Sequence, residues 1–345
     1  MVQRLRASVI AAPSASFINV VGAVVVAYVA VVAGQRIYHG GSTYFLQTMG
    51  FGVAEGSIFA LVALGYTMVY GIIELINFAH GDVFTLGAFF SLALMPTFGL
   101  VEGKTSGWGL VLPLLGLFLV TMLFCAVVNV LIERVAYRPL RHAPRLAPLI
   151  TAIGMSALLE GIMFAWKGPF TLHYPDLLPV NKVTIAPGVT VAAKALIVMG
   201  VAVVLVIALT QFIGRSKLGK AMRATAQDRD AAQLMGIDIN RTISATFFIG
   251  AVLAGAGGII YGLYYTSVGA FDGFQYGLVA FTAAVFGGIG NIPGAALGGL
   301  LIGIIAAISD GYFAPAWTQV LIFSILIFVL VFRPTGLLGT RVPEK

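Results

Sequence analysis

Charged residues are scarce in this chain, since Asp, Glu, Lys and Arg make up only 10% of its 345 residues. A soluble domain usually contains about 25%. Hydrophobic residues account for 59%, and the mean hydropathy is +1.01. No soluble core of this length needs so much apolar surface, so the soluble fold classes are excluded. The composition predicts an all-α fold, a polytopic transmembrane helical bundle, because helices satisfy their own backbone groups in lipid.

Cysteine is nearly absent as well, with Cys125 inside an apolar run as the only one. A single cysteine excludes an intramolecular disulfide and a cysteine metal site. Residues 214–221, Gly-Arg-Ser-Lys-Leu-Gly-Lys-Ala, nearly spell a phosphate-binding loop. Ala221 stands where that loop needs Ser or Thr, and an expected membrane span precedes it instead of a strand. The sequence therefore predicts no ATPase motif, no metal site, no cofactor and no enzyme activity.

The chain is rich in apolar runs and in glycine. Ten membrane spans are expected, each of about 20 residues unless broken or short. They are 16–34, 45–72, 83–99, 108–132, 146–166, 190–213, 242–265, 274–289, 294–310 and 315–332. Among the 42 glycines, pairs four residues apart, such as Gly52/Gly56 and Gly299/Gly303, favour close helix approach.

The basic residues predict the orientation. With the N-terminus inside, most of the twenty Lys and Arg lie on cytosolic segments. The outside receives only Arg36, Lys104, Lys167, Lys182 and Lys194. This is the positive-inside asymmetry, and it explains the net charge of +7 without a nucleic-acid partner. An even number of spans leaves both termini cytoplasmic.

One polar stretch interrupts the apolar runs near the start of the chain. Residues 74–82 contain Glu74, Asn77, His80 and Asp82 between two spans, with Gly81 as an expected hinge. Ionisable groups at such a place are candidates for a transport path, in a broken or re-entrant helix. An ordinary cytosolic turn is the alternative, about equally favoured. A second broken helix is expected near 287–298, around Gly290-Asn-Ile-Pro-Gly294.

Two connections are long enough to have a role. The outer loop 167–189 is proline-rich and contains Tyr174 and Asp176; it is either a solvated loop or a lid or docking surface. The cytosolic loop 214–241 has a helical pattern of its own from Ala221 to a stop at Gly236. A helix this small must lie on the membrane, on the bundle or in a partner's groove.

Several of these segments together resemble the permease subunit of branched-chain amino acid ABC importers. The similar segments, which run in order through residues 45–340, are 63–71, 76–82, 218–228, 234–237, 286–299 and 333–339. Residues 1–44, with the first span, lie outside the resemblance, and 341–345 form a C-terminal tail. The resemblance implies two ATP-binding subunits on the cytosolic face, a periplasmic substrate-binding protein and a second, similar or identical permease.

The resemblance also implies roles for single residues. It places ATPase coupling on the cytosolic loop, at Arg223, Asp228, Arg229, Leu234, Met235 and Gly236. It places Asn77, His80 and Asp82 at or near the translocation path; it gives no expectation for Glu74, which we include beside them with Phe78 as possible apolar lining. The binding protein is expected on the outer loop, at Tyr174 and Asp176.

The function expected from this resemblance is a path for branched-chain amino acids through a bacterial inner membrane, driven by ATP hydrolysis on separate subunits. A permease for urea, short amides or other amino acids is the nearest alternative. An ion-coupled transporter or channel using Glu74, His80 and Asp82 would leave the cytosolic helix unexplained. A membrane enzyme using His80 with Asp82 lacks a second catalytic cluster.

Overall fold

The computed structural model describes residues 15–103, 107–141, 143–144, 146–179 and 181–339. The tail 341–345 and the basic residues Arg4, Arg6, Lys104 and Arg145 therefore lie outside the described residues. The internal contacts divide the chain into two units, 1–47 and 48–345. The fold is described for each unit by itself, and the site lies in the second.

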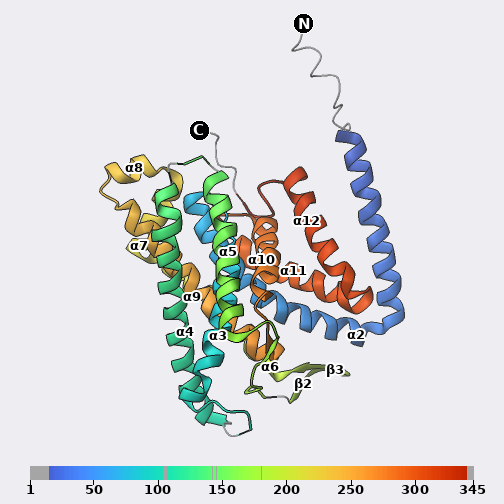
Figure 1. The fold of residues 1–345 in the computed structure, drawn as a ribbon. Helices are drawn as coiled ribbons and strands as arrows, with labels where there is room; N and C mark the ends of the chain where they lie inside the picture. Colours follow the sequence, from blue (N-terminus) through green and yellow to red (C-terminus); the bar gives the residue numbers. More distant parts are fainter. Residues whose placement is uncertain (1–14, 104–106, 142, 145, 180, 340–345) are drawn as a thin grey trace. The chain divides into compact units, whose positions relative to one another are not determined.

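Helices dominate the described residues (Figure 1). The α-helices are α2 (Ala15–Ile73), α3 (Ala79–Leu94), α4 (Val111–Ile132), α5 (Leu146–Lys167), α6 (Ala193–Arg215), α7 (Lys217–Gln227), α8 (Arg229–Leu234), α9 (Ile239–Tyr265), α10 (Asp272–Gly287), α11 (Ile292–Tyr312) and α12 (Thr318–Phe332). The shorter turns are η1 (Met95–Phe98), η2 (Gly107–Leu110), η3 (Glu133–Tyr137, a π-helical turn), η4 (Arg138–Leu140) and η5 (Pro315–Trp317). Within α2 the backbone leaves helical geometry at Gly41 (φ 78°).

In the part of the chain that the structure describes, four short strands form two antiparallel pairs. Strand β1 (Leu172–His173) pairs with β4 (Ser267–Val268), with Leu172 opposite Val268. Strands β2 (Lys182–Ala186) and β3 (Val189–Ala192) form a hairpin with Lys182 opposite Ala192 and Val183 opposite Val191. The hairpin lies at the opposite end of the bundle from α7 and α8 (Figure 1).

The polytopic helical bundle is confirmed. Eight helices among the described residues are long and apolar enough to cross a membrane, and they coincide with eight of the ten expected spans. The expected span 274–289 corresponds to α10, whose 16 residues fall short of the roughly 20 that a full crossing needs. The expected span 16–34 falls in the first part of α2, where most side chains lie outside the described ones.

The core lies around α3 and α9. Most residues of α3 are buried, since it packs against α4, α5, α9 and α10. In α9 the run from Leu253 to Leu263 is buried without interruption. The outer helices α4, α6 and α12 keep broad apolar faces exposed, as membrane-facing helices do.

The glycine pairs join helices of the same chain. A Cβ on Gly303 of α11 would come within 2.2 Å of the Gly56 Cα of α2, and one on Gly299 within 2.4 Å of the Ala60 Cα. The expectation of close helix approach is therefore confirmed.

The helix break near 74–82 is confirmed, but its hinge is not Gly81. Helix α2 ends at Ile73 and α3 begins at Ala79, so the non-helical backbone spans residues 74–78. Glu74 adopts the left-handed conformation (φ 57°) that commonly ends helices. Gly81 is helical, and its lack of a side chain serves close packing: a Cβ there would come within 2.2 Å of the Gly273 carbonyl oxygen of α10.

The second expected break is also present, at residues 288–291 between α10 and α11. The amides of Leu337 and Leu338 donate to the carbonyls of Phe286 and Gly287 at 2.9 Å each. The Asn291 side chain donates to the Leu338 carbonyl (2.7 Å). The segment after α12 therefore satisfies the backbone groups that the break leaves free.

Candidate functional site

The cytosolic loop expected to couple to an ATPase folds into two short helices. We predicted one helix from Ala221 to Gly236, and this is wrong in its middle: α7 ends at Gln227, and Asp228 is extended (φ −155°). The Asp228 carboxylate accepts the Asp230 and Ala231 amides at 2.9 and 3.0 Å, as an N-cap does for a new helix. The predicted end at Gly236 is confirmed by its positive φ (83°).

Two large apolar side chains are exposed at the tip of this loop. Leu234 is 89% exposed and Met235 82% exposed. Ala232 and Met222 of the same loop are buried, so the loop packs on the bundle through these side chains while Leu234 and Met235 stay exposed. An adjacent exposed Leu and Met on a folded loop are typical of a surface that a partner covers.

The loop is bonded to the helices on either side of it. The Arg223 guanidinium donates to the carbonyls of Ile213 and Gly214 at the end of α6. At the other side, the Asp238 carboxylate caps α9 by accepting the Arg241 amide (3.0 Å). These contacts make α7 and α8 an extension of the membrane helices and not a freely moving linker.

A third bond joins the loop to the helix break. The Arg229 Nη2 donates to the Ile72 carbonyl oxygen at 3.0 Å, across 157 residues of sequence. Ile72 lies in the last turn of α2, where the carbonyls have no intrahelical partner. Arg229 therefore caps the helix that leads into the break, and a cation is the favourable group at a helix C-terminus.

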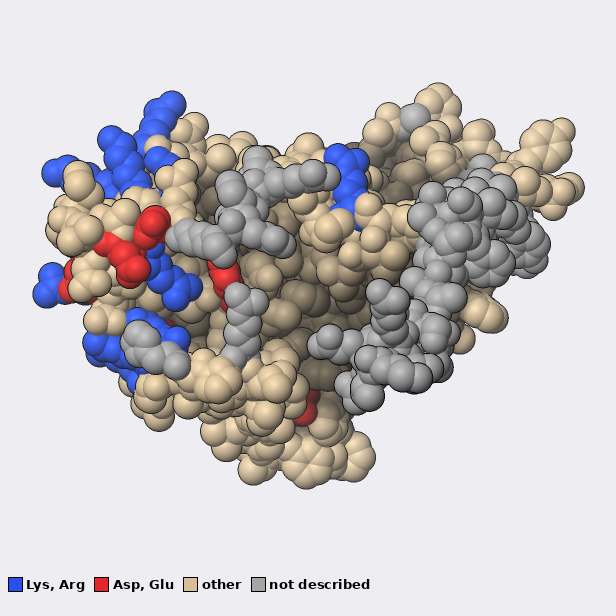
Figure 2. All heavy atoms as spheres, turned by 90° about the horizontal axis from the view of Figure 1, so that it is seen from above, with Lys and Arg blue, Asp and Glu red and all other residues tan. Residues whose placement is uncertain are grey.

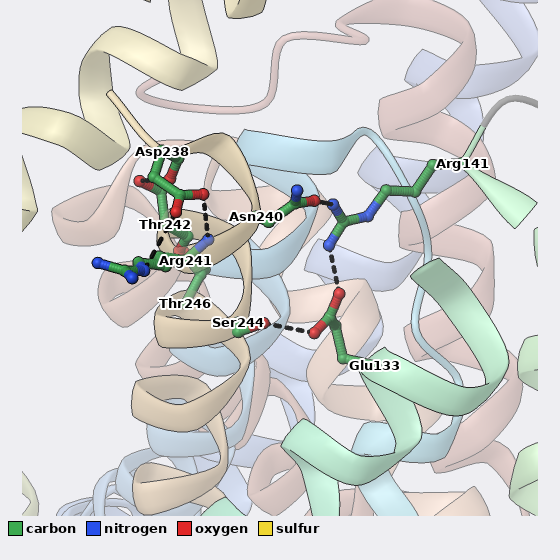
Figure 3. A network of polar contacts seen from close by, with 8 residues as sticks. All are labelled: Glu133, Arg141, Asp238, Asn240, Arg241, Thr242, Ser244 and Thr246. Carbon is green, nitrogen blue, oxygen red and sulfur yellow. Dashed lines mark hydrogen bonds and ion pairs between the residues drawn. The ribbon is translucent and has the colours of Figure 1, made fainter. Parts of the chain in front are cut away.

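A second polar network holds the end of α4 against the start of α9 (Figure 3). The Glu133 carboxylate is fully buried and accepts bonds from Arg141 and from the Ser244 hydroxyl (2.6 Å). Arg141 also donates to the Asn240 side chain (2.7 Å). Burial lowers the pKa of the Arg141 guanidinium, and the facing Glu133 opposes this shift.

The π-helical turn η3, which contains Glu133, also supports the break. At one end of η3 lies Glu133, and at the other end the Tyr137 hydroxyl donates to the Asn77 side-chain oxygen (2.7 Å). Turns of this type are frequent at functional sites in helices. The turn thus connects the α4–α9 network to the backbone of residues 74–78.

A cavity of about 1040 Å³ lies between the break and the loop. The break contributes Glu74, Leu75 and Ile76 to its wall. Charged groups of both signs from the other elements also line it: Glu133, Arg141, Asp228, Arg229 and Asp230. The structure thus brings one expected path residue, Glu74, and two expected coupling residues, Asp228 and Arg229, to one cavity.

Of the expected path residues, only Glu74 lines this cavity. Glu74 is exposed and lines the cavity, whereas Asn77 is 1% exposed and His80 and Asp82 are 0% exposed. His80 packs edge-on to the Tyr66 ring, with centroids 5.0 Å apart, and Asp82 accepts a bond from Ser156. In this conformation the three buried groups do not line the cavity.

Phe78 also lies inside the bundle. Its ring is half-buried and lies 6.3 Å from the Phe281 ring, between centroids. It does not line the cavity in this conformation. Phe78 therefore joins the break to α10 through an apolar contact.

The outer loop differs from its expected role at one residue. Tyr174 was expected to meet a binding protein, but it is fully buried: its hydroxyl bonds to Ser91 (2.8 Å), and its ring fills the space above Gly262. Burial raises the pKa of the Tyr174 hydroxyl. Its side chain anchors the loop instead. Asp176 is half-buried, and the exposed large apolar side chains among the described residues of the loop are Phe170 (76%), Val183 (41%) and Ile185 (60%).

Figure 2 looks down on the α7–α8 end and shows Lys and Arg side chains gathered over these elements. Helix α7 contains Lys217, Lys220 and Arg223, and α6 ends at Arg215. A few acidic side chains lie among them. The clustering agrees with the charge asymmetry from which the cytosolic side was predicted.

Sequence reasoning missed the network around Glu133 and Arg141. Arg141 counted only as a positive charge, and Glu133 was not singled out. A usable signal was present, since a carboxylate directly after the apolar run 108–132 needs a partner near the membrane. The identity of that partner was not readable, because Ser244 lies 111 residues away.

Comparison with known proteins gives a consistent family. Residues 48–330 match the family model described as the permease component of the branched-chain amino acid transport system. The high-affinity branched-chain amino acid permease protein BraD of Pseudomonas aeruginosa is 42% identical over 316 residues, 90% of this chain and 99% of that protein. LivH of Escherichia coli is 41% identical over 305 residues, 88% and 98% of the two chains.

A more distant relative has a similar description. The probable branched-chain amino acid transport permease protein LivH of Methanocaldococcus jannaschii is 27% identical over 299 residues, 83% of this chain and 90% of that protein. No solved structure matches the chain. The family match covers the break, the cavity wall and the cytosolic loop together. The chain therefore belongs to the family of permease components of branched-chain amino acid transport systems.

Proposed function

We propose that this chain is the membrane-spanning permease of a binding-protein-dependent ABC importer and forms the path for leucine, isoleucine and valine. ATP hydrolysis is supplied by two separate subunits on the cytosolic face. A periplasmic binding protein delivers the amino acid to the outer face, and a second permease completes the path. The complex lies in a bacterial inner membrane with both termini of this chain in the cytoplasm.

One observation carries this proposal: the exposed Leu234–Met235 tip belongs to a loop that is bonded to the last turn of α2, next to the helix break. The tip offers the apolar surface that an ATPase subunit would cover. The Arg229–Ile72 bond passes a movement of that loop to the end of α2. The chain thus has a docking surface and a connection to the cavity, without an ATPase motif of its own.

The proposed cycle uses these parts in order. Closure of the ATPases around ATP moves α7 and α8, and with them α6 and α9, to which the loop is bonded. Arg229 transmits the movement to α2, and the non-helical residues 74–78 absorb the change in backbone angles as a hinge does. Glu74 lies at the cytosolic mouth of the path. Asn77, His80 and Asp82 lie behind it and hold the hinge in place.

The proposal of a branched-chain amino acid as the solute depends on the relatives. They are described as branched-chain amino acid permeases and match this chain over nearly their whole length. A permease for urea, short amides or other amino acids would have the same coupling parts. The test is uptake of labelled leucine into proteoliposomes that contain the chain with its native ATPases, second permease and binding protein. We expect accumulation that requires ATP and the binding protein and that valine and isoleucine, but not urea, compete away.

The competing function is an ion-coupled secondary transporter or channel. It predicts that the isolated chain accumulates solute when an ion gradient is imposed, with no ATPase present. That result would overturn the proposed function. ATP-dependent accumulation of urea with no response to leucine would retain the importer and change its solute.

A further inference from the structure

An apolar groove opens on the side of the bundle between α4, α6 and α9. Its volume is about 800 Å³, and α4 contributes Met122 and Val130 to it. Leu205 and Phe212 come from α6, and Phe248 comes from α9. Helices α4 and α9 pack along their length, whereas α6 touches α9 at few places. The gap between α6 and the other two helices is the groove, and it is separate from the cavity at the break.

The length of the groove is close to the thickness of one membrane leaflet. It runs along α4 and into the π-helical turn η3, from Met122 to Arg134. At 1.5 Å per residue this is roughly 18 Å of helix. Half of a hydrocarbon core about 30 Å thick is about 15 Å. An acyl chain that enters from the surrounding leaflet can therefore lie along it.

A basic side chain stands at the end of this groove. Arg134 lines it, is exposed, and has no carboxylate partner within ion-pair distance among the described residues. The adjacent Glu133 is bound to Arg141 and Ser244 instead. Arg215 and Lys217 lie beside the groove-lining Phe212 and Leu218 in sequence. The groove thus has an apolar length and a positive end.

We propose that this groove is a binding site for an anionic phospholipid, with one acyl chain along α4, α6 and α9 and the phosphate on Arg134. Basic pockets between membrane helices at the cytoplasmic surface recognise such headgroups. Two observations favour lipid over a protein segment. The spans α4 and α6 are each only 22% buried, so the groove opens among membrane-facing surfaces. The charged lining residue, Arg134, lies at the end of the groove that would receive the headgroup.

The test is native mass spectrometry of the full-length chain, purified with its partner subunits, after titration with phosphatidylglycerol or phosphatidylethanolamine. We expect retained phosphatidylglycerol adducts on the wild type and fewer with phosphatidylethanolamine. Arg134→Gln should lower the preference for phosphatidylglycerol about fivefold, which is the effect of one basic residue near a membrane surface. Arg333→Gln, which removes a basic residue outside the groove, should not change it.

A second pair of variants tests the groove itself. Ala208→Trp places a large ring among the lining residues, and we expect it to remove the adducts of both lipids. Ala157→Trp on α5 adds the same ring to an exposed position outside the groove and should leave them unchanged. If Ala208→Trp does not fold, the Arg134→Gln preference still decides the headgroup site.

Three outcomes would overturn the proposal. The first is equal retention of the two lipids by the wild type. The second is adducts that persist in Ala208→Trp. The third is absence of lipid together with crosslinking of Phe212→Cys to the second permease, which would identify a protein as the occupant. None of these results bears on whether the complex transports amino acids.

Discussion

The bond between Arg229 and the Ile72 carbonyl allows the coupling route to be tested at a single side chain. A hydrogen bond from a charged group contributes about 1.5–3 kcal/mol when buried. Arg229 is half-exposed, so solvent screening reduces this to about 1–1.5 kcal/mol. Loss of that amount from one state of a conformational equilibrium corresponds to about a fivefold to tenfold change.

We therefore expect Arg229→Ala to lower the rate of ATP-driven uptake about fivefold to tenfold. The ATPases should still co-purify with the chain, because the exposed Leu234–Met235 tip is unchanged. The measurement is uptake and ATP hydrolysis in the same proteoliposomes, with a fall in solute moved per ATP. ATP hydrolysis without uptake would show that the loop has lost its connection to α2.

Arg241→Ala is the matched control. It removes the same type of side chain from the same cytosolic loop. The Arg241 side chain pairs with the exposed Asp238 carboxylate at 3.1 Å, and not with a helix carbonyl next to the break. We expect nearly normal uptake from it, since surface pairs contribute little. Wild-type uptake by Arg229→Ala would refute transmission through this bond, and loss of the ATPases would reassign Arg229 to docking.

Three further changes test other parts of the chain. Leu234→Asp should abolish co-purification of the ATPases while the melting temperature of the membrane domain stays unchanged; retained association would remove the tip from the docking surface. Gly303→Val should prevent folding, because the α2 backbone leaves no room for a side chain, whereas Gly154→Val, with nothing within 4 Å, should purify normally. Tyr174→Phe should lower stability by about 1 kcal/mol through loss of the bond to Ser91, measured as a lower melting temperature; an unchanged melting temperature would contradict an anchoring role.

Prediction from sequence succeeded where a local pattern carries the information. Hydropathy located eight membrane helices because a helix in lipid must satisfy its backbone within the segment and be apolar over about 20 residues. The polar cluster after Ile73 and the glycines around 290 located both breaks for the same reason. Gly236 marked the end of the cytosolic helix because a left-handed residue suits that position.

Prediction failed where the direction of a side chain decides its role. Tyr174 and Asp176 are two residues apart in a proline-rich loop, yet the first is a core anchor and the second is half-buried near the surface. His80 and Asp82 were placed at or near the path; the bundle encloses both completely in this structure, and their role stays a prediction. Gly81 read as a hinge, although its small size is needed for contact with α10.

The sequence by itself determined that this chain is a bundle of membrane helices, broken twice, with one structured loop on its basic side. Those properties depend on the apolarity and backbone preferences of consecutive residues. Only the tertiary structure decided which groups meet, as with Arg229 and Ile72, or Glu133 and Ser244. These pairs are more than a hundred residues apart, and neither local propensity nor hydropathy contains the packing that brings them into hydrogen-bond distance.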